Sequence, residues 1–116
     1  SGSKNLALSP MDMNAMIASV IADYEKNEGK IKAEIKRKPL PSATADEALM
    51  RQALYNLLSN AVKYSSTCEK PVIEVGGKTQ GLENIYYIKD NGVGFDLKYA
   101  DKLFAIFQRL HSEADF

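Results

Sequence analysis

The chain has 116 residues, of which 45% are apolar and 26% are charged. These proportions are typical of one globular domain with a modest core. Fifteen Lys and Arg side chains balance fifteen Asp and Glu side chains, which argues against nucleic acid as the main partner, since such proteins usually carry a basic excess. No apolar run approaches the roughly 20 residues of a membrane span. The single cysteine, Cys68, cannot form an internal disulfide, and we expect a cytoplasmic protein.

The N-terminal half of the chain predicts one helix and one strand. In residues 11–27 apolar side chains recur every three or four positions, as in an amphipathic helix. Asp12 is placed to cap this helix and Gly29 to end it. Residues 31–37 (IKAEIKR) alternate apolar and charged side chains and predict a half-buried strand. Two prolines in residues 38–42 then interrupt regular structure.

A longer helix is predicted from about Ala45 to Tyr64. Its apolar stripe consists of Leu49, Met50, Ala53, Leu54, Leu57, Leu58, Ala61 and Val62. A separate arc of roughly 80° holds Gln52, Asn56, Asn60 and Lys63. Amides favour caps and turns over helix interiors, so an organised amide face is unusual. Solvated surface is the simplest explanation for it, and a binding surface is the alternative.

The C-terminal half predicts two strands and a last helix. Residues 72–80 and 84–90 are rich in β-branched and aromatic residues and are separated by Gly81, which indicates antiparallel neighbours. The last predicted helix carries Leu103, Phe104 and Phe107. Helices and strands in this order predict an α/β two-layer sandwich, with the helices on one face of a mixed, mostly antiparallel sheet.

A glycine motif, DNGVGFD, follows the second of these strands. It places Asp90 at the strand end and Gly92 and Gly94 two residues apart. Glycines at this spacing let the backbone approach a ligand without interference from Cβ. A strand-end carboxylate can accept a hydrogen bond from an exocyclic amine such as that of adenine. By itself the motif favours an ordinary turn, because Asn-Gly pairs mark turns.

Three segments in this order resemble the ATP-binding domain of sensor histidine kinases, within the wider family shared with gyrase, Hsp90 and MutL. Residues 52–65 (QALYNLLSNAVKYS) resemble the N box, DNGVGFD resembles the G1 box, and residues 102–116 (KLFAIFQRLHSEADF) resemble the F box. The last segment is especially similar to phytochrome-like and hybrid kinases. The resemblance covers about residues 11–116 as one catalytic domain, with residues 1–10 interpreted as a tag remnant and linker. It implies the Bergerat fold, with ATP and Mg²⁺ as ligands.

For the phosphate end of the nucleotide, the resemblance implies three residues on the amide face. Asn60 would hold the Mg²⁺ that bridges the phosphates, because Mg²⁺ prefers hard oxygen ligands and keeps several of its waters. Asn56 would assist at the same cluster, and Lys63 would contact phosphate oxygens. Asn56, Asn60 and Lys63 are therefore the candidate catalytic residues.

For the nucleoside end, the resemblance implies the glycine motif and the end of the helix. Tyr64 would lie against the adenine or the ribose. Asp90 would accept a hydrogen bond from the adenine amine, while Gly92 and Gly94 let the backbone close over the base.

One departure from the family pattern favours a kinase over an ATPase. ATP-hydrolysing relatives carry a glutamate four residues before the metal-binding asparagine, and Asn56 stands there in this chain. An amide cannot activate water. The γ-phosphoryl group would pass to a histidine on a separate dimerisation domain of the same kinase, in a phosphorelay to a response regulator. Two alternatives stay open: a non-catalytic nucleotide-responsive interaction module, and an anti-sigma-type serine kinase of the same fold.

Two family features are missing from the sequence. No Gly-x-Gly-x-Gly run, the G2 box that donates backbone amides to the phosphates, occurs in the 116 residues. We therefore expect a C-terminally truncated domain that binds ATP weakly or not at all, is inactive alone, and self-associates through an unpaired strand edge. The acceptor hairpin is absent too, because the one histidine, His111, lies in the F-box-like segment and is expected to be a lid or surface residue.

Overall fold

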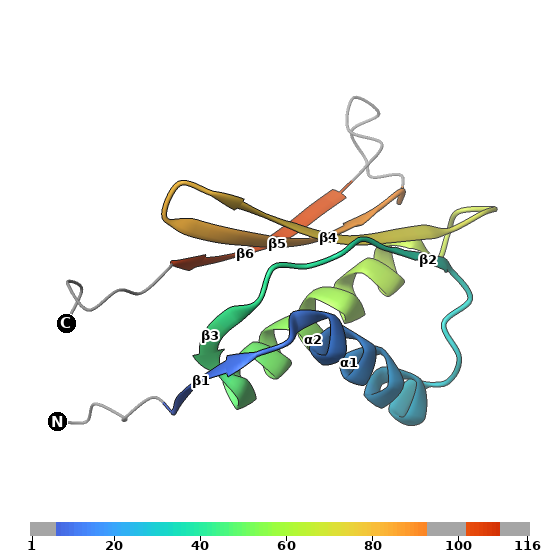
Figure 1. Cartoon of the computed structure of the whole chain (residues 1–116). Helices are drawn as coiled ribbons and strands as arrows, with labels where there is room; N and C mark the ends of the chain where they lie inside the picture. The colour runs from blue at the N-terminus through green and yellow to red at the C-terminus, as the bar shows by residue number, and fades with distance from the viewer. Residues whose placement is uncertain (1–6, 93–101, 110–116) are drawn as a thin grey trace, which may run out of the picture.

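Two helices cover one face of a four-stranded sheet in the computed structural model, which describes residues 7–92 and the backbone of residues 102–109 (Figure 1). The elements of this described part are β1 (Leu8–Met11), α1 (Met13–Glu28), β2 (Glu34–Arg37), β3 (Ala43–Asp46), α2 (Glu47–Ser65), β4 (Val72–Gln80), β5 (Glu83–Asp90) and β6 (Lys102–Arg109). The layered arrangement agrees with the predicted two-layer sandwich.

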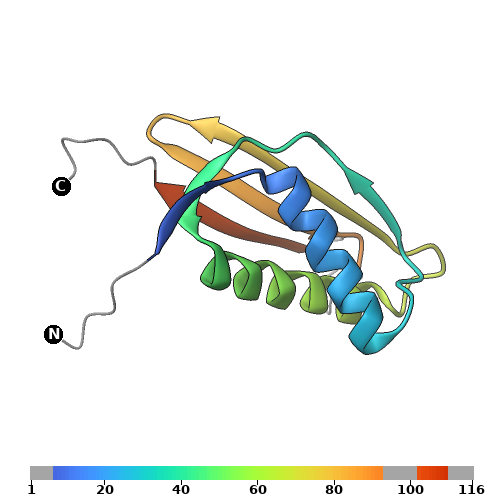
Figure 2. The same ribbon diagram turned by 60° about the horizontal axis from the view of Figure 1, so that its bottom comes forward.

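The sheet is mixed and mostly antiparallel, as predicted. Its strand order is β2-β4-β5-β6, in which β2 runs parallel to β4 and the other neighbours are antiparallel. The β4–β5 hairpin turns at Gly81, whose φ of 61° is one that glycine adopts without strain. A separate pair, β1 and β3, lies beside the start of α2 (Figure 2).

The first helix, predicted over residues 11–27, forms over Met13–Glu28 with the predicted cap at Asp12 and the predicted stop at Gly29. Asp12 Oδ1 accepts hydrogen bonds from the backbone N–H groups of Asn14 (2.9 Å) and Ala15 (3.2 Å), as an N-cap does. Gly29 follows the helix with a φ of 98°, and its N–H donates to the Glu25 carbonyl at 2.9 Å. Capping chemistry therefore fixes both ends of α1.

The second helix begins two residues later than predicted, at Glu47, because Asp46 is its N-cap. Asp46 Oδ1 accepts from the Leu49 N–H at 3.1 Å, and Oδ2 accepts from the Ala7 N–H at 3.1 Å. These backbone hydrogen bonds hold the pKa of the Asp46 carboxyl below its ordinary value. Residues 43–46 form β3 instead of the first helical turn.

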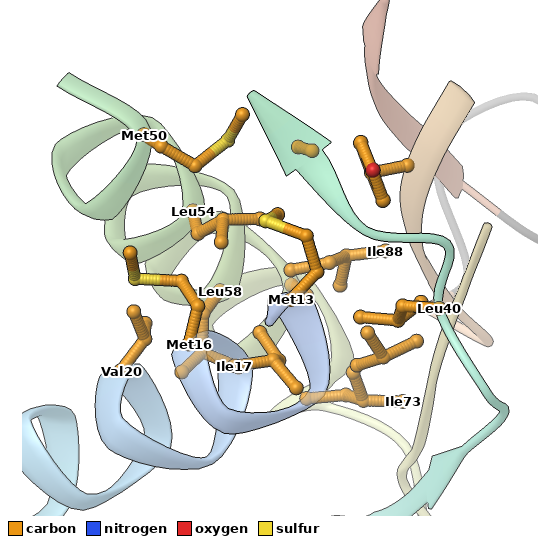
Figure 3. Packing of buried hydrophobic residues seen from close by; sticks show 14 of the residues in the cluster. Met13, Met16, Ile17, Val20, Leu40, Met50, Leu54, Leu58, Ile73 and Ile88 are labelled. Carbon is orange, nitrogen blue, oxygen red and sulfur yellow. The ribbon is translucent and has the colours of Figure 1, made fainter. Parts of the chain in front are cut away.

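The core lies between the two helices and the sheet (Figure 3). Its fully buried side chains include Ile17 of α1, Leu58 of α2, and Ile73 and Ile88 of the sheet. Burial at this level stabilises by about 2 kcal/mol per large aliphatic side chain. Leu49 was predicted to belong to the apolar stripe of α2, but it is 54% exposed and lies outside the core.

Three strand predictions need correction. The strand predicted over residues 31–37 is shorter, since β2 begins at Glu34 and the Ile31 N–H is bound by Glu25 Oε2 at 2.8 Å. The short strands β1 and β3 were not predicted. The segment after residue 101 was predicted as a helix and forms β6 instead, because β5 offers it an open edge with eight paired positions. The side chains of Phe104 and Phe107 lie outside the described part.

Among the residues that the structure describes, neither helix has the length and apolar content needed to cross a membrane.

Two leucines on α2 provide a matched test of this core. Leu58 is fully buried, whereas Leu49 is 54% exposed on the same helix. We expect Leu58→Ala to lower the free energy of unfolding by about 3 kcal/mol, because it leaves a cavity. Leu49→Ala should change it by less than about 0.5 kcal/mol. Urea unfolding followed by circular dichroism measures both, and equal losses would contradict the packing described here.

Candidate functional site

The exposed side of α2 carries the four candidate ligand-binding residues of this helix: Asn56, Asn60, Lys63 and Tyr64. We call these four residues the polar face of α2. The opposite face of α2 fixes the orientation of the polar face, because Leu54, Leu58 and Ala61 are buried in the core. A rotation of the helix that hid the polar face would expose this apolar stripe.

The polar face runs along the helix towards its carboxyl end. Eight residues separate Asn56 from Tyr64, which corresponds to about 12 Å at the rise of an α-helix. Near the end, Lys63 Nζ lies 5.7 Å from the centroid of the Tyr64 ring, within the range of a cation–π contact. The face therefore offers amides first, then a cation, then an aromatic ring.

Asp90 ends β5 and is only 1% exposed. Its Oδ1 accepts a hydrogen bond of 2.7 Å from the Gly92 N–H, which closes a tight turn over Asn91. Burial of a carboxylate is costly unless hydrogen bonds compensate it, so this bond helps to hold Asp90 in place. We call residues 90–92 the Asp90–Gly92 turn.

The Asp90–Gly92 turn lies directly against the end of α2. A Cβ atom added to Gly92 would stand 2.4 Å from the Tyr64 carbonyl oxygen and 2.8 Å from its carbon. Of the described glycines, only Gly29 and Gly81 have positive φ, so close approach and not backbone conformation requires glycine here. The fold thereby brings the end of the polar face and the glycine motif together. Gly94 lies outside the described residues.

The segment after α2 gives its last turn a cap that sequence reasoning missed. Ser66 Oγ donates to the Lys63 carbonyl at 2.7 Å, and the Cys68 N–H donates to the Ser65 carbonyl at 3.0 Å. The half-buried Cys68 thiol donates to the Asn91 carbonyl at 3.2 Å. The polar run SSTC gave the only signal in the sequence, and a polar run indicates a loop without indicating its partners.

Asn56 also borders an open depression between α1 and α2. This depression has a volume of about 450 Å³, and its other lining residues are Asp23, Lys26, Asn27, Ala48, Arg51, Gln52 and Tyr55. Arg51 connects the helices here, since its Nη1 lies 2.8 Å from Ser19 Oγ and 3.0 Å from Asp23 Oδ2. The depression provides a second polar surface beside the polar face.

The donor set favours a metal bound together with phosphates over a metal bound by protein alone. Within residues 7–92, no group of three His, Cys, Asp or Glu side chains gathers around a common point. The amide oxygens of Asn56 and Asn60 are exposed on one helix face. Mg²⁺ commonly takes one or two protein oxygens and completes its shell with phosphates and water, so these residues fit that ion.

One known protein family matches the part of the chain that contains these residues. The family model described as "Histidine kinase-, DNA gyrase B-, and HSP90-like ATPase" matches residues 45–115, which include all of α2 and the Asp90–Gly92 turn. The chain belongs to this ATPase family. The predicted N box and G1 box both fall inside the matched range.

Relatives of this ATPase domain include a cyanobacterial phytochrome and a histidine kinase. Cyanobacterial phytochrome A from Nostoc sp. (strain PCC 7120 / SAG 25.82 / UTEX 2576) is 37% identical over 84 residues, covering 72% of the chain and 11% of that protein. The methanogenesis regulatory histidine kinase FilI from Methanothrix harundinacea (strain 6Ac) is 33% identical over 75 residues, covering 65% of the chain and 8% of that protein. The chain thus spans only a small part of the relatives it matches, and it corresponds to their histidine kinase ATPase domain.

Solved structures agree on the fold. Histidine kinase AdeS from Acinetobacter baumannii superposes with a TM-score of 0.72 at 15% identity, covering 94% of this chain and 70% of that one. Histidine kinase ShkA, solved in complex with AMPPNP, superposes with a TM-score of 0.63 at 26% identity, covering 82% of this chain and 21% of that one. The predicted Bergerat fold is confirmed.

Substitution of Gly92 tests the contact between the turn and α2. Gly92→Ala should lower the free energy of unfolding by about 2 kcal/mol, because the methyl group overlaps the Tyr64 carbonyl. Gly29→Ala is the control, since Gly29 has positive φ but open space around it, and it should cost about 1 kcal/mol. Amide chemical shifts near Tyr64 should move only in the Gly92 variant. A Gly92→Ala protein as stable as the wild type would contradict the close approach.

Proposed function

We propose that the chain is the ATP-binding catalytic domain of a two-component sensor histidine kinase, which donates the γ-phosphoryl group of ATP to a histidine on a separate dimerisation domain. One observation carries the proposal. The polar face of α2 ends where the Asp90–Gly92 turn meets the Tyr64 carbonyl, inside the range matched by the ATPase family. Candidate phosphate-binding residues on the polar face and candidate adenine-binding residues of the adjoining turn would therefore lie close together.

At the nucleoside end, Asp90 is the group that would recognise adenine. Its Oδ1 is held by the Gly92 N–H at 2.7 Å, which fixes the carboxylate in one orientation without neutralising it. A fixed carboxylate is an acceptor suited to an exocyclic amine. Tyr64, 41% exposed beside the turn, offers an aromatic surface for the base or the ribose. Gly92 would let the turn close against the Tyr64 carbonyl, and Gly94 would let the backbone close over the base.

At the phosphate end, Lys63, Asn60 and Asn56 follow one another away from the turn. Lys63 would contact phosphate oxygens as a point charge. Asn60, assisted by Asn56, would orient the triphosphate through Mg²⁺. When bound, Mg²⁺ neutralises charge that develops on the transferring phosphoryl group. The protein supplies positioning and electrostatic stabilisation, which account for most of phosphoryl-transfer catalysis.

The identity of residue 56 separates transfer from hydrolysis. Asn56 is exposed on the polar face, and its amide has no basic oxygen with which to take a proton from water. Bound ATP would therefore not be hydrolysed quickly, and its γ-phosphoryl group would be transferred when an acceptor side chain is present. This supports a kinase over an ATPase within the same family.

The acceptor and the downstream partner follow from the kinase class. The acceptor would be a histidine of the dimerisation domain of the same kinase. Histidine kinase ThkA, which shares the fold with a TM-score of 0.59 at 19% identity, was solved in complex with the response regulator protein TrrA. A response regulator is accordingly the partner that we propose for the phosphorelay.

Two residues on the same side of α2 test the metal role. Asn60→Ala should weaken ATP binding in the presence of Mg²⁺ by about tenfold, a loss of about 1.4 kcal/mol, and should make the affinity independent of Mg²⁺. Gln52→Ala is the matched control, because Gln52 is also an exposed amide on α2 but has no proposed contact with the metal or the nucleotide. Calorimetry with Mg²⁺ and with EDTA measures both variants.

The same pair tests phosphoryl transfer in a longer chain that carries this domain with a histidine-bearing hairpin. Labelled ATP should give acid-labile phosphohistidine with the wild type and with Gln52→Ala, and at most about 1% of that rate with Asn60→Ala. Equal labelling by the two variants would refute the assignment of Asn60. Absence of ATP binding in a wild-type chain extended through a Gly-x-Gly-x-Gly segment would favour an interaction module.

A further inference from the structure

Asn91 lies between the two residues of the Asp90–Gly92 turn that the proposed function uses, and the sequence analysis gave it no role. We propose that Asn91 is a positioning residue, which holds the Asp90–Gly92 turn at a fixed place relative to the end of α2. The proposal rests on the proposed function, because only a ligand that bridges the turn and the polar face of α2 needs this fixed separation.

Four hydrogen bonds connect Asn91 to residues 68–72, which form the end of the connection from α2 and the first residue of β4. Its side chain accepts from the Val72 N–H at 2.8 Å through Oδ1 and donates to the Lys70 carbonyl at 2.9 Å through Nδ2. Its backbone N–H donates to the Val72 carbonyl at 3.2 Å, and its carbonyl accepts from the Cys68 thiol at 3.2 Å. Every polar group of Asn91 is therefore directed at this one segment.

The side-chain bonds of Asn91 act where the sheet ladder stops. The register of β4 and β5 ends at the pair Ile73 and Asp90, the backbone bond from Asn91 to Val72 extends it by one residue, and the Asn91 side chain adds two further bonds at this point. The segment bound by Asn91 is itself attached to α2, since the Cys68 N–H donates to the Ser65 carbonyl at 3.0 Å. A continuous route of hydrogen bonds thus runs from the last turn of α2 to the residue between Asp90 and Gly92.

Ordinary turn chemistry does not explain the Asn91 side chain. Asparagine favours turns because its side chain bonds to its own nearby backbone, but here the partners lie 19 and 21 residues away in sequence. The turn itself is closed by Asp90 Oδ1. An amide is suited to the observed role because it offers a donor and an acceptor together. Aspartate has no donor for the Lys70 carbonyl, and alanine has neither group.

Asn14 provides a matched control. Its side chain makes the same pair of bonds to a loop backbone, accepting from the Leu40 N–H at 2.9 Å and donating to the Leu40 carbonyl at 3.4 Å. It lies at the start of α1, in neither the polar face nor the turn. Asn91→Ala and Asn14→Ala therefore remove the same kinds of bond. We expect similar decreases in unfolding midpoint for the two variants.

Nucleotide affinity distinguishes a positioning role of Asn91 from a contribution to the stability of the fold alone. In an ATP titration with Mg²⁺ followed by NMR, Asn91→Ala should raise the Kd about tenfold, and Asn14→Ala should change it by less than about twofold. Equal effects of the two variants on the Kd would overturn the proposal, because Asn91 would then act only through stability.

Hydrogen exchange tests the same inference without a nucleotide. The amide hydrogens of Gly92 and Val72 should exchange about tenfold faster in Asn91→Ala than in the wild type, and at the wild-type rate in Asn14→Ala. Unchanged exchange at Gly92 in Asn91→Ala would overturn the proposal. If a wild-type chain extended through a Gly-x-Gly-x-Gly segment binds no ATP, the proposed function fails, while the exchange rates still decide whether Asn91 fixes the turn.

Discussion

The contact between the Tyr64 carbonyl and Gly92 is the constraint on which the candidate site depends. It joins the carboxyl end of α2 to the turn after β5, two elements that belong to different layers of the sandwich. Core packing under α2 sets the rotation of the helix, and the ladder between β4 and β5 sets the position of Asp90. Only a residue without Cβ lets these two rigid parts meet, so one glycine determines whether a nucleotide could span both.

The chemistry of the surface follows from which groups the core leaves exposed. Amide oxygens, one ammonium group and one phenol lie on the solvent side of α2, while the carboxylate of Asp90 is buried at the other end. A buried carboxylate favours a neutral hydrogen-bond donor over a phosphate, because like charges repel strongly where water is excluded. In the proposed function, this charge pattern would orient ATP with its base towards Asp90 and its phosphates towards Lys63 and Asn60.

Sequence reasoning succeeded where local chemistry decides the structure. The caps at Asp12 and Gly29, the hairpin at Gly81 and the exposed amide face of α2 each depend on neighbours within a few residues. It failed where distant partners decide. The segment that forms β6 has helical spacing of apolar residues but pairs with the open edge of β5, and the partners of Asn91 lie about 20 residues away. The roles proposed for Asn56, Asn60, Lys63, Tyr64 and Asp90 rest on the family resemblance and stay predictions.

The most direct measurement is a map of amide chemical shifts of the wild-type chain as ATP and Mg²⁺ are added. The account predicts that the largest changes fall together on the polar face of α2 around Tyr64 and on the Asp90–Gly92 turn, because one ligand touches both. Changes confined to the depression between α1 and α2, around Lys26 and Tyr55, would contradict it. No change at millimolar ATP in a chain extended through a Gly-x-Gly-x-Gly segment would show that the amide face of α2 is solvated surface.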